Sequence, residues 1–286
     1  MVKINEYEFT FGADPEFFVA KKGVPVSAYG LVPGTKAAPM PVKGGAVQVD
    51  GMALEFNIDP AKDPERFAFN LDLVLNQIMK MVPNYEVYGG CVANFGVDYI
   101  KAQPKEASEL GCNPDYNAYT GLANPRPDVD TPFRTAAGHI HIGWTNNVDP
   151  MDPGHFKACQ RVVKQLDRYV GVPSLFWDMD VKRRELYGKA GAFRPTHFGV
   201  EYRVLSNAWL LKPDHNYFLR KYVIHQSIEA IKALFDEPED CDNDMFGKTA
   251  SEIINNSDLE SAKAAIAYSG KIISPKKFRE EIVGVK

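Results

Sequence analysis

The chain has 286 residues, of which 45% are hydrophobic and 24% are charged, proportions typical of a globular protein. This length is enough for one large core or two modest domains. The formal net charge of −4 argues against a general nucleic-acid or membrane surface.

The sequence lacks the segments that mark membrane-spanning or secreted proteins. No apolar run is long enough to span a bilayer, and the first residues show no apolar signal-peptide segment. The four cysteines form no CxxC motif, so a zinc ribbon or a dithiol redox site is disfavoured. Their wide spacing fits a reducing compartment and predicts a cytoplasmic protein. They are Cys91, Cys112, Cys159 and Cys241.

The first part of the chain is rich in strand-like segments. Pro15 interrupts the first of them and predicts an edge or a bulge, because proline cannot donate to a sheet ladder. Gly51 predicts a kink in the last. The expected segments are a strand over residues 7–20, a turn and short strand over 22–29, a Pro- and Gly-rich loop over 30–45, and a strand over 46–58.

The hydrophobic period then changes. Apolar residues at helical spacing predict an amphipathic helix over residues 64–82, followed by a strand over 85–95. Residues 98–135 are the least regular region. Loops of that length are uncommon and are usually functional, so we expect this region and the C-terminal helices to influence substrate choice.

The second half alternates strands and helices. Thr249 and Glu252 match a capping box at the start of a short helix. The expected segments are a strand over residues 136–145, helices over 153–170 and 174–186, a glycine-punctuated loop over 187–196, a strand over 197–205, a helix over 214–235, an acidic linker over 236–244, and short helices over 249–255, 258–268 and 275–283.

This order of elements predicts an α+β fold, with helices packed on one face of a mostly antiparallel sheet. The other face of the sheet would be free to carry a functional site. We expect one main domain over residues 1–235 and a C-terminal helical extension, after the acidic linker, over residues 236–286.

Four strand-like segments each place two polar side chains two residues apart. Alternate residues of a strand point to the same face, about 7 Å apart. Carboxylates and imidazoles on a buried face are costly unless they meet a metal, a charge partner or a ligand. The sequence therefore predicts a metal and anion site on one sheet face. The pairs are Asp14 and Glu16, Glu55 and Asn57, His139 and His141, and Glu201 and Arg203.

Each pair also has a simpler explanation. Asp14 could start a solvated turn, Glu55 could lie on a wet face, the histidines could be hydrogen-bonded core residues, and Glu201 could form an exposed intrastrand salt bridge. Against this, carboxylates suit Mg²⁺ or Mn²⁺, and two imidazoles can share a metal or divide the work between metal and substrate. The planar donor fork of Arg203 suits phosphate.

Basic residues cluster around the glycine-punctuated loop and could hold triphosphate charge. At least two of them are expected to lie on a solvated helix face instead. The cluster consists of Lys182, Arg183, Arg184, Lys189 and Arg194. The remaining histidines have no comparable setting and are predicted to be structural or exposed. They are His155, His197, His215 and His225.

Several common motifs are excluded. The acidic run over residues 240–244 fails the EF-hand template, because Met245 stands where glycine is needed and Ser251 where the bidentate glutamate is needed. No Walker A, GxGxxG or GxSxG motif occurs, which disfavours P-loop, dinucleotide-binding and α/β-hydrolase chemistry.

Taken in order, these segments resemble the metal-binding strands of the glutamine synthetase-like superfamily. The pattern is most similar to the small carboxylate–amine ligases of phages and bacteria, the type 2 amidoligases. The resemblance spans residues from about 10 to 207. It is carried by the segments FGADPEFF at residues 11–18, Asp50-Gly51 with Glu55, GCNPDYNA at 111–118, GHIH at 138–141, the loop Tyr187–Arg194, and EYR at 201–203.

The resemblance implies a curved, mostly antiparallel sheet of the glutamine synthetase type with ATP and Mg²⁺, or Mn²⁺, as cofactors. It implies that Arg203 stabilises the γ-phosphoryl group, and that Arg184 and Arg194 contact the nucleotide or a carboxylate. From the basic cluster described above, we also expect Lys182, Arg183 and Lys189 to contact the nucleotide. The implied metal ligands are Glu16, Glu55, His139 and Glu201, with Asp14 and His141 close to them.

The implied reaction joins a carboxylate to an amine through an acyl phosphate made from ATP. The substrates would be small molecules or peptides, with a modified nucleobase left open, in the host cytoplasm if the chain is phage-encoded. The chain is too short for the additional N-terminal domain of glutamine synthetase, so the ring-shaped oligomer of that enzyme is not implied. The number of metal ions and the oligomeric state stay open.

Three other functions fit parts of the pattern. A phosphotransferase of the same fold, as in the guanidino kinases, would make a stable phosphorylated product and no amide. A metallohydrolase built on the HxH segment would need no nucleotide. A non-catalytic phage protein could retain the scaffold, although it would be expected to lose its charged ligands first.

Overall fold

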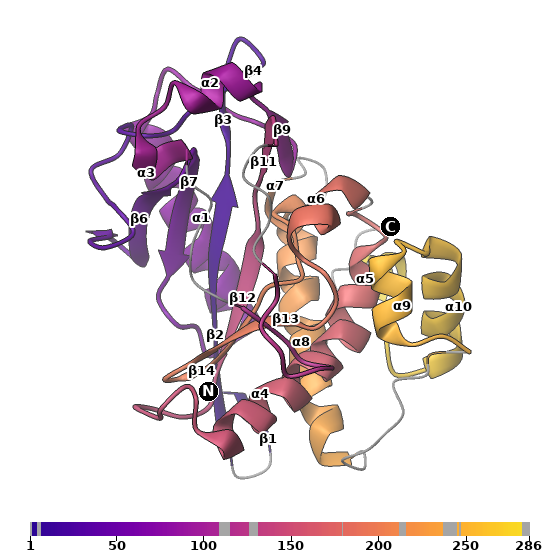
Figure 1. Cartoon of the computed structure of the whole chain (residues 1–286). Helices are drawn as coiled ribbons and strands as arrows, with labels where there is room; N and C mark the ends of the chain where they lie inside the picture. Colours follow the sequence, from indigo (N-terminus) through magenta and orange to yellow (C-terminus); the bar gives the residue numbers. More distant parts are fainter. Residues whose placement is uncertain are drawn as a thin grey trace.

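The computed structural model confirms a mixed architecture in which a large antiparallel sheet packs against helices (Figure 1). This agrees with the predicted α+β class. The residues that the structure describes are 2–4, 7–108, 115–125, 131–178, 180–211, 216–236, 245 and 247–281.

The main sheet has nine strands in the order β10-β13-β14-β12-β2-β7-β6-β5, with β1 paired to β2, and its strand pairs are antiparallel. The predicted strands over residues 136–145 and 197–205 contribute strands to it, and so do residues 7–17 of the strand predicted over 7–20, whose last residues belong to a separate small sheet. The bounds are β1 Val2–Ile4, β2 Tyr7–Phe17, β5 Met40–Val42, β6 Gly45–Asp50, β7 Ala53–Ile58, β10 Tyr116–Asn117, β12 Gly138–Gly143, β13 Ala192–Thr196 and β14 Gly199–Tyr202.

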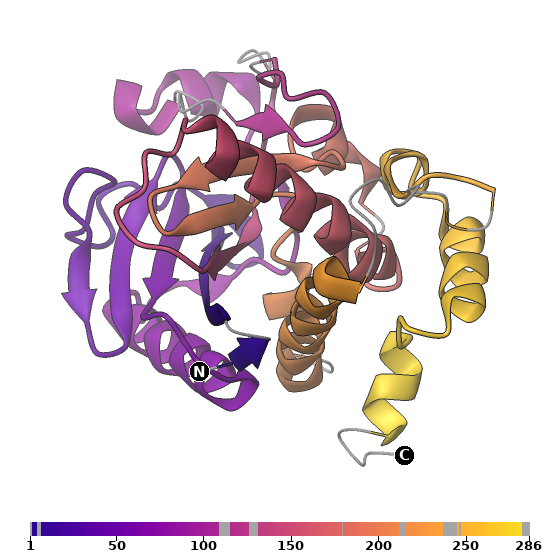
Figure 2. The same ribbon diagram turned by 90° about the horizontal axis from the view of Figure 1, so that it is seen from below.

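Three long helices cover one face of this sheet. They are α1 (Pro64–Met81), α4 (Pro153–Leu166) and α8 (Asn216–Asp236), and α8 contacts both of the others (Figure 2). Helix α1 buries the apolar stripe that its sequence predicts, including Phe67, Leu71, Val74 and Ile78. The sheet residues facing the helices are apolar and buried, so the opposite face is left to the polar side chains.

Shorter elements complete the fold. Strands β3, β4 and β8 form a small sheet, and β9 pairs with β11. The bounds are β3 Val19–Lys21, β4 Val24–Val26, β8 Glu86–Val87, β9 Val92–Asn94, β11 Phe133–Thr135, α2 Val97–Lys101, α3 Lys105–Ser108, α5 Val172–Ser174, α6 Val181–Leu186 and α7 Ala208–Leu211, with a π-helical turn at Asp167–Gly171 between α4 and α5.

Some local predictions are wrong. Gly51, with φ of 58°, belongs to the turn between β6 and β7, so residues 46–58 form a hairpin and not one kinked strand. Pro15 lies in the interior strand β2, opposite Gly138, and not at an edge. Strand β7 pairs with β2 only at Glu16 and Phe17, immediately after the proline. The sheet therefore needs no backbone hydrogen bond from Pro15 to β7.

Other segments are divided more finely than predicted. The expected loop over residues 187–196 contains β13, and the loop over 30–45 contains β5. The expected strand over 85–95 is two short strands. The expected helix over 174–186 is interrupted between α5 and α6, and the irregular region 98–135 contains short helices and strands.

The C-terminal helices agree with their predicted positions. They are α9 (Ala250–Asn255), α10 (Leu259–Ser269) and α11 (Pro275–Glu281), and the capping box of Thr249 and Glu252 is formed. They pack against α5, the π-helical turn and α8 (Figure 1). The acidic run 240–244 lies outside the described residues, and the domain boundary at residue 235 stays a prediction. None of the described helices is long and apolar enough to cross a membrane.

Asp167, in the π-helical turn, is a fully buried carboxylate behind the sheet. It accepts hydrogen bonds from the hydroxyls of Tyr119 and Tyr202, at 2.8 and 2.7 Å, and from the backbone N–H of Gly191 at 2.7 Å. Burial raises the pKa of Asp167 to about 7 despite these three donors. The native protein therefore binds this proton more tightly than the unfolded chain does.

Substituting Asp167 should change how stability depends on pH. Between the unfolded pKa of about 4 and the native value, the unfolded state binds fewer protons, so the free energy of unfolding falls as pH rises. From about pH 5 to about pH 7.5, we expect the wild type to lose about 2 kcal/mol relative to Asp167→Asn, which cannot ionise. Urea denaturation at both pH values measures this difference, and parallel behaviour of the two proteins would contradict it.

Candidate functional site

The register of the sheet brings the predicted polar residues onto one face. Side chains alternate along each strand, so the neighbouring positions Ala13, Ile140 and Tyr202 point into the core instead. Four cross-strand pairs build the polar face: Asp14 opposite His139, His141 opposite Glu201, Glu201 opposite Arg194, and Glu16 opposite Glu55.

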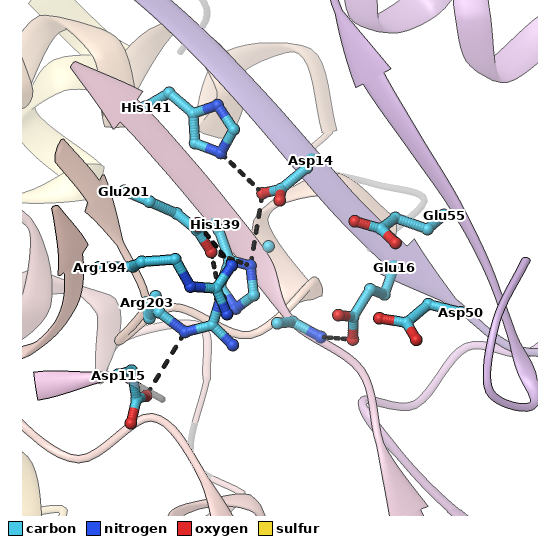
Figure 3. A network of polar contacts seen from close by, with 12 residues as sticks. Asp14, Glu16, Asp50, Glu55, Asp115, His139, His141, Arg194, Glu201 and Arg203 are labelled. Atoms are coloured by element: carbon cyan, nitrogen blue, oxygen red, sulfur yellow. Dashed lines mark hydrogen bonds and ion pairs between the residues drawn. The ribbon is translucent and has the colours of Figure 1, made fainter. Parts of the chain in front are cut away.

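Asp14, His139 and Glu201 form a compact triad at the centre of this face (Figure 3). Their candidate ligand atoms all lie within 4.8 Å of one another. Nδ1 of His139 is 3.3 Å from Oδ1 of Asp14 and 3.3 Å from Oε1 of Glu201. Nε2 of His141 is 3.1 Å from the same Oδ1 of Asp14. Side chains from the three neighbouring strands β2, β12 and β14 therefore meet in one small volume.

Buried donor atoms of the triad and of the neighbouring His141 fit a divalent cation. Oδ1 of Asp14, Nδ1 of His139 and Nε2 of His141 are buried and make no hydrogen bond within the described structure. Burial raises the pKa of Asp14, but the two histidines outweigh this and hold that pKa well below its usual range. Imidazole nitrogens without hydrogen-bond partners suit Zn²⁺ and other transition-metal ions, and the carboxylate oxygens beside them suit Mg²⁺ or Mn²⁺.

Glu16 and Glu55 form a second acidic group beside the triad. They are direct cross-strand neighbours, and Asp50 at the end of β6 lies next to them (Figure 3). Burial and the neighbouring carboxylates raise the pKa of Glu55 well above its ordinary value, and burial raises the pKa of Glu16. Like charges facing each other across a sheet are destabilising, so this group also favours a bound cation.

Two polar groups partly balance this acidic group. Nε2 of Gln48 donates to Oε2 of Glu55 at 2.6 Å, and Nζ of Lys36 lies 2.7 Å from Oδ2 of Asp50. The backbone N–H of Ala137 donates to Oε2 of Glu16 at 2.9 Å, which fixes the direction of that side chain. Because β6 runs beside β7, Gln48 and Asp50 point to the same face as Glu55.

Arginines define the other end of the site. Arg203 forms an ion pair with Glu201 through Nη1, and its Nε lies 3.4 Å from Oδ2 of Asp115 (Figure 3). Arg194 donates to Oε2 of Glu201 at 3.0 Å. Burial alone would raise the pKa of Glu201, but Arg203, His139 and Arg194 lower it. Glu201 thus contacts both His139 of the triad and the two arginines.

The structure gives the other predicted basic residues partners elsewhere. Arg183, with 1% of its surface exposed, donates to the backbone oxygens of Val204 at 2.8 Å and Arg203 at 3.4 Å. It therefore holds the backbone that carries Arg203. Arg184 is also buried and donates to Oγ of Ser257 at 3.1 Å.

The two predicted lysines are exposed. Nζ of Lys182 lies 4.1 Å from the centre of the Phe133 ring, and Lys189 lies on the loop before β13. Neither they nor the buried Arg183 and Arg184 share a described contact with the triad. Their roles in nucleotide binding stay predictions.

The remaining polar residues singled out from the sequence lie in ordinary environments. His155 is buried and bonds to the backbone oxygen of Thr196 at 2.9 Å, while His197 is exposed. His225 is half-buried on α8, and burial lowers its pKa. Asn57 is half-buried and has no evident role. His215 lies outside the described residues.

Sequence analysis gave no role to several residues near the site: Lys36, Gln48, Asp115 and Tyr187. Gln48 stands two residues before Asp50, so the same alternation could have revealed it. Asp115 reaches Arg203 from the irregular region. Burial and the negative charge of Glu16 raise the pKa of Tyr187 to about 12, so the Tyr187 phenol is influenced by the acidic group of the site. No period or motif marks Lys36 in the sequence.

The fold and the site together define an α+β protein with a candidate divalent-metal centre and an adjoining pair of arginines on one face of an antiparallel sheet. Residues 132–263 match the family model described as phage phiEco32-like COOH.NH2 ligase-type 2, and this match supports the resemblance of the chain to the amidoligases. No curated protein matches the chain.

The matched segment contains only part of the site. His139, His141, Arg194, Glu201 and Arg203 lie within it, whereas the carboxylates of β2, β6 and β7 precede it. The match also continues past residue 207, where the sequence motifs end, through α8 and α9 and into α10.

Proposed function

We propose that the chain is an ATP- and Mg²⁺-dependent ligase that joins a carboxylate to an amine through an acyl phosphate, on a sheet of the glutamine synthetase type. The observation that carries this proposal is the convergence of Asp14, His139 and Glu201 beside Arg203, in a chain whose residues 132–263 match a family described as COOH.NH2 ligases. Family and geometry support it independently.

The residues present fit the proposed cofactors. Asp14, His139 and Glu201 would hold one divalent cation, and Glu16 and Glu55 offer oxygens for a second. Such cations neutralise charge on phosphate oxygens. Of these two groups of candidate ligands, the triad is the better defined, because its three donor atoms already lie close together. His141, 3.1 Å from Asp14, would orient that carboxylate.

The reaction asks the protein mainly for positioning. An oxygen of the substrate carboxylate attacks the γ-phosphorus of ATP, and the bond to the ADP oxygen breaks. The amine nitrogen then attacks the acyl carbon, loses a proton, and phosphate leaves. Phosphoryl transfer depends on in-line placement and charge stabilisation. Arg203 and Arg194, at one end of the carboxylate face, are suited to hold the transferred phosphoryl group.

The test uses the purified chain with Mg-ATP and panels of amino acids, peptides and polyamines. ADP release is measured together with mass spectrometry of the products. We expect ADP formation that requires both substrates, and a product with the mass of an amide. Glu16→Ala and His139→Ala should not consume ATP.

Other outcomes would replace the proposal. A stable phosphorylated product without an amide would indicate a guanidino kinase-like phosphotransferase. Hydrolysis activated by Zn²⁺ with no need for ATP would indicate a metallohydrolase. Failure to bind ATP at all, with the fold intact, would indicate a non-catalytic protein.

A further inference from the structure

Lys36 lies in a tight turn at Thr35–Ala38, within the longer loop between β4 and β5. Thr35 and Ala38 exchange backbone hydrogen bonds across this turn, at 3.1 and 3.0 Å. The hydroxyl of Thr35 also accepts from the backbone N–H of Ala38 at 3.2 Å. The turn therefore has a defined shape, and the direction in which Lys36 leaves the backbone is set by it.

The turn is fixed against β6. The backbone N–H of Val49 donates to the oxygen of Gly34 at 3.0 Å, and Thr35 forms an isolated bridge with Val49. A Cβ atom at position 34 would lie 1.9 Å from the backbone oxygen of Val47, so glycine is needed for this close approach. The contact brings Nζ of Lys36 to 2.7 Å from Oδ2 of Asp50.

The charge of Lys36 is placed at the acidic end of the site. Asp50 lies beside Glu16 and Glu55 (Figure 3). Burial would lower the pKa of Lys36, but these three carboxylates outweigh it and raise that pKa. Arg194 and Arg203 lie at the other end, beyond the triad. Lys36 is thus a cation beside carboxylates that also suit a divalent ion.

We propose that Lys36 is a displaceable counter-ion of this acidic end. Its ammonium balances Asp50, Glu16 and Glu55 until a divalent cation occupies them, and it then contacts anionic oxygens of the bound nucleotide. The side chain is 49% exposed and has four rotatable bonds, so moving it costs little packing. The inference rests on the metal and nucleotide sites of the proposed function.

The first measurement is Mn²⁺ binding without nucleotide, by calorimetry or by the Mn²⁺ spin-resonance signal. Removing a competing ammonium should make Lys36→Met bind Mn²⁺ about fivefold more tightly, a modest change because the ion pair is half exposed. Lys36→Arg, which keeps the charge, should stay within about twofold of the wild type. Lys43→Met, an exposed lysine in the adjoining β5–β6 turn, is the matched control.

The second measurement is the affinity for a non-hydrolysable ATP analogue with Mg²⁺ present. Here the sign should reverse, and Lys36→Met should bind the analogue about fivefold more weakly. A lysine with only a structural role would not shift the two affinities in opposite directions.

The outcomes separate the two levels of the proposal. Unchanged or weaker Mn²⁺ binding by Lys36→Met, with wild-type binding intact, overturns the counter-ion role and leaves the proposed function standing. Tighter Mn²⁺ binding with unchanged analogue binding overturns the nucleotide contact. Absence of Mn²⁺ binding by the wild type overturns the metal site itself, and the role of Lys36 with it.

Discussion

Arg203→Ala is expected to lower ATP-dependent turnover by a factor of about 10³ or more, the range seen when an arginine that stabilises phosphoryl transfer is removed. The side chain is held between Glu201 and Asp115, and these carboxylates outweigh burial and raise its pKa, so its charge is secure. Arg203→Lys keeps the charge but loses the planar fork, and we expect an intermediate loss.

The controls for this experiment separate chemistry from folding. Arg66→Ala removes an exposed arginine on α1, on the opposite face of the sheet, and should leave turnover unchanged. Because Arg203→Ala leaves Glu201 with fewer charge partners, its thermal unfolding must be measured alongside. Turnover within about threefold of the wild type in a folded Arg203→Ala protein would contradict the assigned role.

His139→Asn is expected to abolish both metal binding and turnover. His139 contributes the nitrogen that lies between Asp14 and Glu201, so its loss leaves two carboxylates without a central donor. Substitutions of groups that only support metal ligands typically cost 10- to 100-fold in affinity, so a direct ligand should cost more than about 100-fold. Calorimetric titration with Mn²⁺ measures this loss directly.

The matched control is His197→Asn, since His197 is exposed on the turn between β13 and β14. It should bind Mn²⁺ as the wild type does. If His139→Asn also retained wild-type affinity, the central triad would not be the metal site, and the Glu16–Glu55 pair would become the stronger candidate.

Much of the site follows from one rule of strand geometry. Residues two apart on a strand share a face, so Asp14 with Glu16, and His139 with His141, could be assigned together from sequence alone. The long helices were also predictable, because their apolar residues recur at helical spacing. What a single sequence does not contain is register, so the pairing of His139 with Asp14, and not with Glu16, became visible only in the folded sheet.

Loops limited the remaining predictions. Asp115 and Lys36 reach the site from segments with no repeating pattern, and their positions depend on contacts far along the chain. Arg183 was misleading for a different reason. Its charge suggested a ligand contact, yet its guanidinium is buried against the backbone at Val204. Composition alone does not distinguish a basic residue that binds a ligand from one that supports the backbone.

The position of β2 between β12 and β7 has a consequence for how this site could vary. Asp14 belongs to the triad on one side of β2, and Glu16 belongs to the acidic group on the other. The offset between the two groups is therefore one repeat of a single strand, about 7 Å, and is fixed by covalent geometry. Insertions in the surrounding loops could alter which acid and amine are admitted without changing this internal distance. The residues of the metal site could then stay the same among related proteins while the loops that select the substrates change.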